Sequence, residues 1–208
     1  MRKTLGLTAA AAAATIGAVL AAPAAPAAPA SAGAAHRAPA RVTGSAEFAL
    51  PFWPDDDVRA FAFDATAVPY SRPVTGLPTG SPADATGTVR VSHRLAADGV
   101  TVRFEAAVDC LITSPGHATL TAVVTRADEP VRDWVGTRVG FSVQDRDRGP
   151  DRVGFTWSVS ADQNEAGEWG AARVGTCLAP APFATVTRGG YTVRHADLTP
   201  PPDRPRSR

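Results

Sequence analysis

The sequence predicts an all-β protein in which a single antiparallel meander of about eight strands closes into a small β-barrel. Two patterns predict this fold. Apolar and polar residues alternate with a period of two, and short turns rich in glycine, proline and aspartate separate these stretches. Only residues 130–136 carry a helical signal, one turn long. Barrel closure hides the two edge strands of a meander, so we favour a barrel over the alternative of a β-sandwich.

The expected strands follow one another in order along the chain. They are centred on residues 61–65, 89–95, 100–110, 118–124, 139–143, 153–159, 174–178 and 191–195. In the third of these, the even-numbered positions from Val100 to Cys110 are apolar and share one face, whereas most odd-numbered positions are polar. Turns at 96–99, 114–116 and 189–190 contain glycine, which adopts the positive φ that tight hairpin turns require.

The N-terminus predicts export. Met1-Arg2-Lys3 precedes an apolar, alanine-rich run, and small residues follow up to an A-x-A site at residues 30–32. We therefore expect a signal peptide over 1–32, a disordered lead-in over 33–50, the barrel domain over 51–198 and a disordered proline-rich tail over 199–208. Prolines from position 23 interrupt the apolar run, so we expect a secreted, extracellular protein without an integral membrane segment after cleavage.

Two cysteines, Cys110 and Cys177, are present. In an exported chain an even number of cysteines predicts a disulfide, and two free thiols are the alternative. A bridge between these positions closes a long loop and would stabilise the fold by about 4 kcal/mol if it acts on the entropy of the unfolded chain.

Charges of opposite sign are interleaved along the chain. Lys and Arg number 21 against 20 Asp and Glu, and residues 145–148 read Asp-Arg-Asp-Arg. This pattern lacks the basic footprint of a nucleic-acid or anionic-membrane surface, so we expect no nucleic-acid partner. Lys3 is the only lysine and lies in the predicted leader, which excludes Schiff-base and P-loop chemistry in the exported protein.

The familiar enzyme templates are missing from the sequence. It contains no Gly-x-Ser-x-Gly, no His-Glu-x-x-His, no Cys-x-x-Cys and no glycine-rich phosphate loop. We therefore expect a non-catalytic protein without a cofactor. An extracellular hydrolase that uses loop carboxylates or a histidine pair is the alternative.

Two sets of residues are candidates for a metal site. Asp145, Asp147 and Asp151 resemble half of a calcium loop, although neighbouring arginines would compete for the carboxylates; a charged hairpin turn is the alternative. His93 and His195 fall on the apolar faces of their expected strands. If the strands are neighbours, the two imidazoles could form a metal or acid/base site; otherwise each bonds to backbone at a strand end.

Trp53, Trp134 and Trp169 lie in or beside loops. Exposed tryptophans stack on sugar rings or anchor protein partners, so these three are candidate ligand contacts. The alternative is that they fold back over the ends of the barrel.

Six short stretches of strand, turn and cysteine character together form a recognisable set. They are VDCL at 108–111, RVGFSVQD at 138–145, PDRVGFTW at 150–157, DQNE at 162–165, GTCLAPAPF at 175–183 and TRGGYTVRHA at 187–196. This set resembles a family of exported actinobacterial proteins sometimes labelled repetin. The resemblance covers about residues 58–198. It implies secretion, a β fold and the disulfide, and it implies no catalytic residues.

These observations favour a secreted, disulfide-stabilised barrel that acts as a binding or structural module at the cell exterior. The expected partner is a cell-wall or extracellular glycan or a protein. A secreted inhibitor or small-ligand carrier is a further alternative, which requires a cavity of about 300 Å³ or more.

Overall fold

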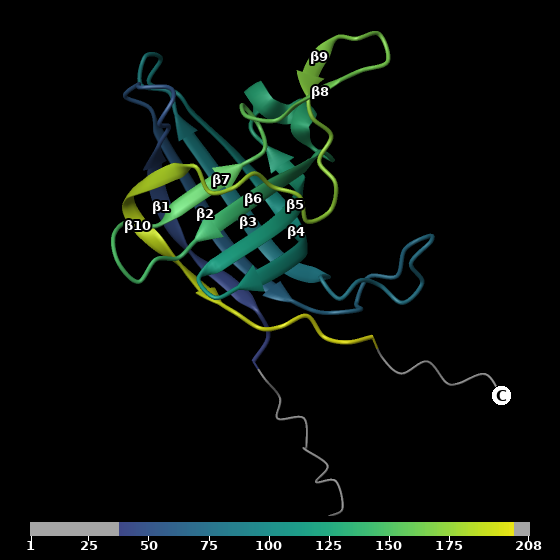
Figure 1. Ribbon diagram of the computed structural model, residues 1–208. Helices are drawn as coiled ribbons and strands as arrows, with labels where there is room; N and C mark the ends of the chain where they lie inside the picture. The colour runs from purple at the N-terminus through teal and green to yellow at the C-terminus, as the bar shows by residue number, and fades with distance from the viewer. Residues whose placement is uncertain (1–37, 202–208) are drawn as a thin grey trace, which may run out of the picture. The chain divides into compact units, whose positions relative to one another are not determined.

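The computed structural model describes residues 38–201 and confirms the predicted all-β barrel. Eight antiparallel strands close in the spatial order β1-β10-β7-β6-β5-β4-β3-β2, and β8 pairs with β9 in a separate hairpin (Figure 1). The elements are β1 (Arg41–Ala49), β2 (Val58–Ala67), β3 (Ala85–Arg94), β4 (Thr101–Ser114), β5 (His117–Ala127), the 3-10 helix η1 (Glu129–Trp134), β6 (Arg138–Gln144), β7 (Arg152–Phe155), β8 (Ala161–Gln163), β9 (Trp169–Ala171) and β10 (Ala184–Arg194). Within residues 38–201, no helix has the length and hydropathy that crossing a membrane requires.

The barrel begins earlier than the sequence predicts. Residues 41–49 lie in the segment expected to be a disordered lead-in, yet they form β1, which pairs with both β2 and β10. Alternation is weak here because Gly44 occupies an inward position. A side chain at Gly44 would overlap the backbone of Gly190 on the neighbouring strand, and its φ of +124° favours glycine. The predicted signal peptide over 1–32 and residues 202–208 of the predicted tail lie outside the described residues.

Two further expectations about elements are wrong. Residues 174–178 form no strand, and Gly189 and Gly190, expected to form a turn, lie inside β10. The register between β1 and β10 shifts at Glu47 and Phe48, near these glycines, so the pair belongs to an irregular stretch of the ladder.

Aromatic side chains fill the interior of the barrel. The ring of Phe61 lies 4.6 Å from that of Phe48 and 5.4 Å from those of Phe141 and Phe155, measured between ring centroids. All four are buried, together with alternating valine, leucine and alanine residues of the other strands. Burial of this apolar surface is the main stabilising contribution to the fold.

The connection between β9 and β10 crosses the outside of the barrel. We call residues 172–183 the crossing segment; its backbone passes over Gly140 and Gly154, where a side chain would overlap its carbonyl oxygens. The hydroxyl of Ser142 donates a hydrogen bond of 2.6 Å to Pro180 O, and the Arg152 guanidinium donates to two further carbonyls of the segment. β6 and β7 are therefore covered on their outer face.

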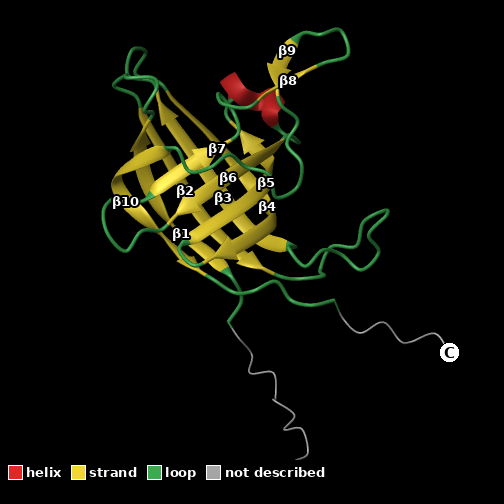
Figure 2. Cartoon of the chain, viewed as in Figure 1, coloured by secondary structure: helices red, strands yellow, loops and turns green. Residues whose placement is uncertain are grey.

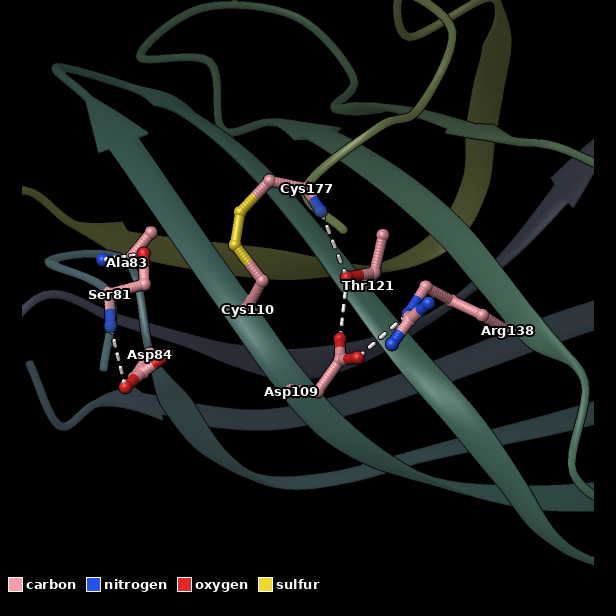
Figure 3. Close-up of a disulfide and its surroundings, with 8 residues drawn as sticks. All are labelled: Ser81, Ala83, Asp84, Asp109, Cys110, Thr121, Arg138 and Cys177. Carbon is pink, nitrogen blue, oxygen red and sulfur yellow. Dashed lines mark hydrogen bonds and ion pairs between the residues drawn. A yellow bond between two sulfur atoms is a disulfide. The ribbon is translucent and has the colours of Figure 1, made fainter. Parts of the chain in front are cut away.

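A disulfide between Cys110 and Cys177 attaches the crossing segment to β4, as predicted (Figure 3). The two Cα atoms lie 5.4 Å apart, which is typical of disulfides. The expectation that Cys110 shares the inward face of Val108 is wrong. A β-bulge at Asp109 turns Cys110 to the outer face opposite Thr121, while Leu111 returns to the core.

A buried polar network supports this outer attachment. The Thr121 hydroxyl donates a hydrogen bond of 2.6 Å to Asp109 Oδ1 and accepts one from the backbone N–H of Cys177. Arg138 Nε donates to the other carboxylate oxygen of Asp109 at 2.7 Å (Figure 3). The network and the disulfide together attach the crossing segment to β4, β5 and β6 at neighbouring residues.

Candidate ligand-binding site

One end of the barrel holds a pocket of about 530 Å³. At this end β1, β3, β5 and β7 finish and η1 lies, drawn in red in Figure 2; we call it the mouth. The pocket is lined mainly by aromatic rings from several elements: Phe48, Phe52, Trp53, Phe61, Trp134, Phe155 and Trp157. The filled interior beneath it closes the bottom of the pocket.

The rings divide into a floor and a rim. Trp134 at the end of η1 and Trp157 after β7 pack on the core, with ring centroids 5.8 Å apart, and form the floor. Phe52 and Trp53 lie in the loop between β1 and β2 and are 50% and 64% exposed, so they form the rim. Trp134 therefore folds back over the end of the barrel, which was the alternative to a ligand contact, and it also lines the pocket.

Charged side chains lie beside these rings. Arg59 and His93 are cross-strand partners on β2 and β3, and both occupy positions that face the barrel interior. The Arg59 guanidinium bonds both carboxylate oxygens of Asp55, at 2.8 Å and 2.6 Å, and Asp57 at 3.1 Å. Although Arg59 is buried, its charge is therefore compensated by two carboxylates.

Asp57 connects three parts of the mouth. Its Oδ2 shares a hydrogen bond of 2.7 Å with His93 Nε2, and its Oδ1 accepts the backbone N–H of Ala96 at 2.8 Å. The loop between β1 and β2 is thereby fixed to β3 and to the β3–β4 turn. Trp53 projects from a loop that is held at its end by this network.

These contacts shift the ionisation of the groups involved. The hydrogen bond from Arg59 lowers the pKa of Asp55, and the same contact raises the pKa of Arg59. The bond from the Ala96 N–H, reinforced by His93, lowers the pKa of Asp57. At neutral pH Asp55, Asp57 and Arg59 are therefore charged, and the arginine is already occupied by carboxylates.

The remaining predicted site residues lie elsewhere. Trp169 lies on β9, is 72% exposed and does not line the mouth. His195 follows β10 at the opposite end of the barrel from His93; its Nδ1 lies 3.1 Å from the Thr113 hydroxyl and its Nε2 3.3 Å from Asp197. The hypothesis that His93 and His195 form one site is therefore wrong.

The aspartates of the predicted calcium loop serve barrel closure. Asp151 Oδ2 accepts the backbone N–H of Tyr191, and Asp145 Oδ2 accepts that of Val193, both at 2.8 Å. Asp147 is exposed and joins neither contact. Among residues 38–201, no three His, Cys, Asp or Glu side chains are placed to hold a metal ion together.

Sequence reasoning missed Arg59, Asp55 and Asp57. The sequence did contain a signal for Arg59. Residues 59, 61, 63 and 65 are spaced by two, so Arg59 lies on the same inward face of its strand as Phe61, Phe63 and Ala65. An inward arginine two residues after an acidic run requires a carboxylate partner.

The site thus has the form of a ligand pocket: concave, largely apolar and bordered by a few fixed polar groups. Comparisons with protein-family models, with curated proteins and with solved structures give no match for this chain. A barrel fold alone does not define a function, so the pocket itself is the feature that indicates one.

Proposed function

We propose that this chain is a non-catalytic binding module of the cell exterior that holds a glycan at the mouth of its barrel. The observation that carries the proposal is the pocket of about 530 Å³ with an aromatic floor and an exposed aromatic rim. The predicted leader, the disulfide and the resemblance to exported repetin-like proteins support the location.

A glycan suits the chemistry of the mouth. Tryptophan and phenylalanine faces stack on the C–H-bearing faces of sugar rings, and Trp53 and Phe52 offer such faces to solvent. Arg59 and His93, held in place by Asp55 and Asp57, bring polar groups beside these rings. Because the interior is filled, the ligand lies across the mouth, and a carrier that encloses its ligand inside the barrel is disfavoured.

The hydrolase alternative has less support. The histidine pair that it would need is divided between the two ends of the barrel, and within residues 38–201 the imidazole of His93 contacts Asp57 and no hydroxyl or thiol. Asp57 in turn is engaged with Ala96 and Arg59. Their observed role is to fix the loop over the mouth.

Retention on polysaccharides tests the proposal. The mature protein is passed over insoluble cellulose, chitin and peptidoglycan, and run through gels containing soluble neutral glycans. We expect retention on at least one, with Trp53→Ala weakening it tenfold or more, equivalent to about 1.4 kcal/mol. Trp169→Ala is the matched control, because that tryptophan is similarly exposed but lies outside the pocket. Loss of retention to the same extent in both variants, or no retention on any glycan, would overturn the proposal.

A further inference from the structure

A second hollow, of about 410 Å³, lies on the outer face of β2, β3 and β4, which the crossing segment does not cover. Its floor consists of small, half-buried side chains, Ala60, Ala62 and Ser92. It shares Phe61, Val91 and Ser92 with the mouth pocket, but its charged lining residues do not line the mouth. We call it the arginine groove.

Strand register gathers three arginines along this groove. Arg90 on β3 and Arg126 on β5 are both cross-strand partners of Glu105 on β4. Adjacent strands lie about 4.8 Å apart, so the two arginines flank Glu105 from either side. Arg103 stands two residues before Glu105 on the same face of β4 and opposite Ser92.

These arginines differ in what they contact. Arg90 Nε donates to Glu105 Oε1 at 3.0 Å. The guanidinium groups of Arg103 and Arg126 make no hydrogen bond or ion pair within residues 38–201, and both side chains are exposed. Asp128, the other carboxylate of the groove, accepts the backbone N–H of Arg103 at 2.9 Å. In the described part of the chain, Arg103 and Arg126 therefore have no carboxylate partner, and the lining of the groove holds three arginines against the two carboxylates Glu105 and Asp128.

Arg103 and Arg126 are close enough to act on one group. They occupy diagonal positions on neighbouring strands, which places such residues about 7–8 Å apart, within reach of two long side chains directed at a common point. A guanidinium presents a planar fork that matches the oxygens of a carboxylate, sulfate or phosphate.

We propose that the arginine groove binds an acidic polysaccharide. Arg103 and Arg126 hold one acidic group of the polymer between them, and the sugar backbone lies over Ala60, Ala62 and Ser92. The groove therefore takes an acidic ligand and the mouth a neutral one, because Arg59, the inward arginine at the mouth, is already paired with carboxylates.

Affinity electrophoresis and calorimetry of the mature protein test this site. The probes are polygalacturonate for carboxylates, dextran sulfate for sulfates and polyphosphate for phosphates, with neutral dextran as the uncharged reference. We expect binding to at least one polysaccharide probe, weakened tenfold or more in R103Q/R126Q and more salt-sensitive in the parent than in that variant. The control is R148Q/R173Q, which removes the same charge from exposed positions outside the groove and should change binding less than twofold.

Three results would overturn the assignment. Equal weakening in the two double variants would show a general charge effect. Absence of binding to the two acidic polysaccharides at about 0.15 M salt would remove the site. Tighter, arginine-dependent binding of poly-glutamate or polyphosphate than of either polysaccharide would identify another class of occupant. Trp53→Ala separates this proposal from the first, because it should weaken neutral-glycan retention tenfold or more and leave polyanion binding unchanged.

Discussion

Gly140 on β6 lies beneath the crossing segment, and a methyl group there would overlap the carbonyl oxygen of Leu178. We expect Gly140→Ala to lower the free energy of unfolding by about 1–3 kcal/mol, because overpacking forces the segment outward. Urea denaturation of the oxidised protein measures the change. Gly170→Ala is the control, since no atom lies within 4 Å of a side chain built there. Equal stability of the two variants would mean that the crossing segment adjusts freely.

Asp55 and Asp57 make the stability of the mouth depend on pH. Their folded-state pKa values are lowered from the ordinary 3.8, so both carboxylates stabilise the fold above that pH, and this contribution is lost as the pH falls through the folded-state values. We expect D55N/D57N to have a lower Tm at pH 7 and a smaller drop in Tm between about pH 5 and pH 2. Differential scanning calorimetry over this range measures both.

Asp56→Asn provides the comparison, because Asp56 is exposed and its side chain makes no hydrogen bond or ion pair within the described part of the chain. Its acid-induced drop in Tm should match that of the parent protein. If D55N/D57N retained the full drop as well, the acid response would arise elsewhere in the barrel.

Single-residue parity predicted part of the candidate site. Alternation placed His93 on an inward face, where it does lie, because alternation reports the face of a strand directly; Trp53 and Trp134 were identified as tryptophans in or beside loops. The network of Arg59 with Asp55 and Asp57 was not predicted, since it depends on how a loop folds back over the mouth. The outward turn of Cys110 was missed for a similar reason: the bulge at Asp109 leaves no clear trace in the pattern.

Among elements, the pairing of β7 with β10 is the shortest join in the barrel. Only Ala184 with Val153 and Thr185 with Arg152 form ladder pairs. Further along β10, the carboxylates of Asp151 and Asp145 take the place of a neighbouring strand and accept backbone N–H groups. Side chains from the β6–β7 loop therefore complete a closure that the main chain leaves unfinished.

We expect Asp151→Ala to reduce the free energy of unfolding by about 1–3 kcal/mol, because the N–H of Tyr191 loses its acceptor in a partly buried place. Hydrogen exchange should show faster exchange at that amide than at the amides of β4. Asp147→Ala, in the same loop but exposed, should leave both quantities unchanged. Unaltered protection of the Tyr191 amide in Asp151→Ala would assign the closure to other contacts.

The elements recovered from sequence are those with regular alternation. β2, β3, β4, β5 and β6 follow the predicted stretches closely, because each has a buried face and a polar face. β1 was missed because Gly44 stands where the pattern needs an apolar side chain, and the first half of β10 was missed because Gly189 and Gly190, in the middle of that strand, were interpreted as a turn. The arginine groove was equally hidden, because register, and not spacing in sequence, brings Arg103 near Arg126.

At the scale of the whole molecule, the two ends of the described chain meet to close the barrel. β1 forms nine residue pairs with β10 and eight with β2, so it contributes to two ladders at once. It also brings the buried Val42, Ala46 and Phe48 to the core. Without β1, both β2 and β10 would become open edges, and the aromatic core would be exposed on one side.

We therefore expect a chain that starts at residue 38 to melt cooperatively like the full-length chain, and a chain that starts at residue 50 to show no cooperative transition. Far-UV and near-UV circular dichroism during heating distinguish the two, because loss of packing around Trp157 and Trp134 abolishes the near-UV signal. A cooperative melt of the shorter chain within a few degrees of the longer one would restore the boundary near residue 51 that alternation alone suggests. Absence of a cooperative transition in the shorter chain would instead show that the fold depends on β1. The sequence of β1 has little β pattern, and its pairing with β2 and β10 stabilises it as a strand.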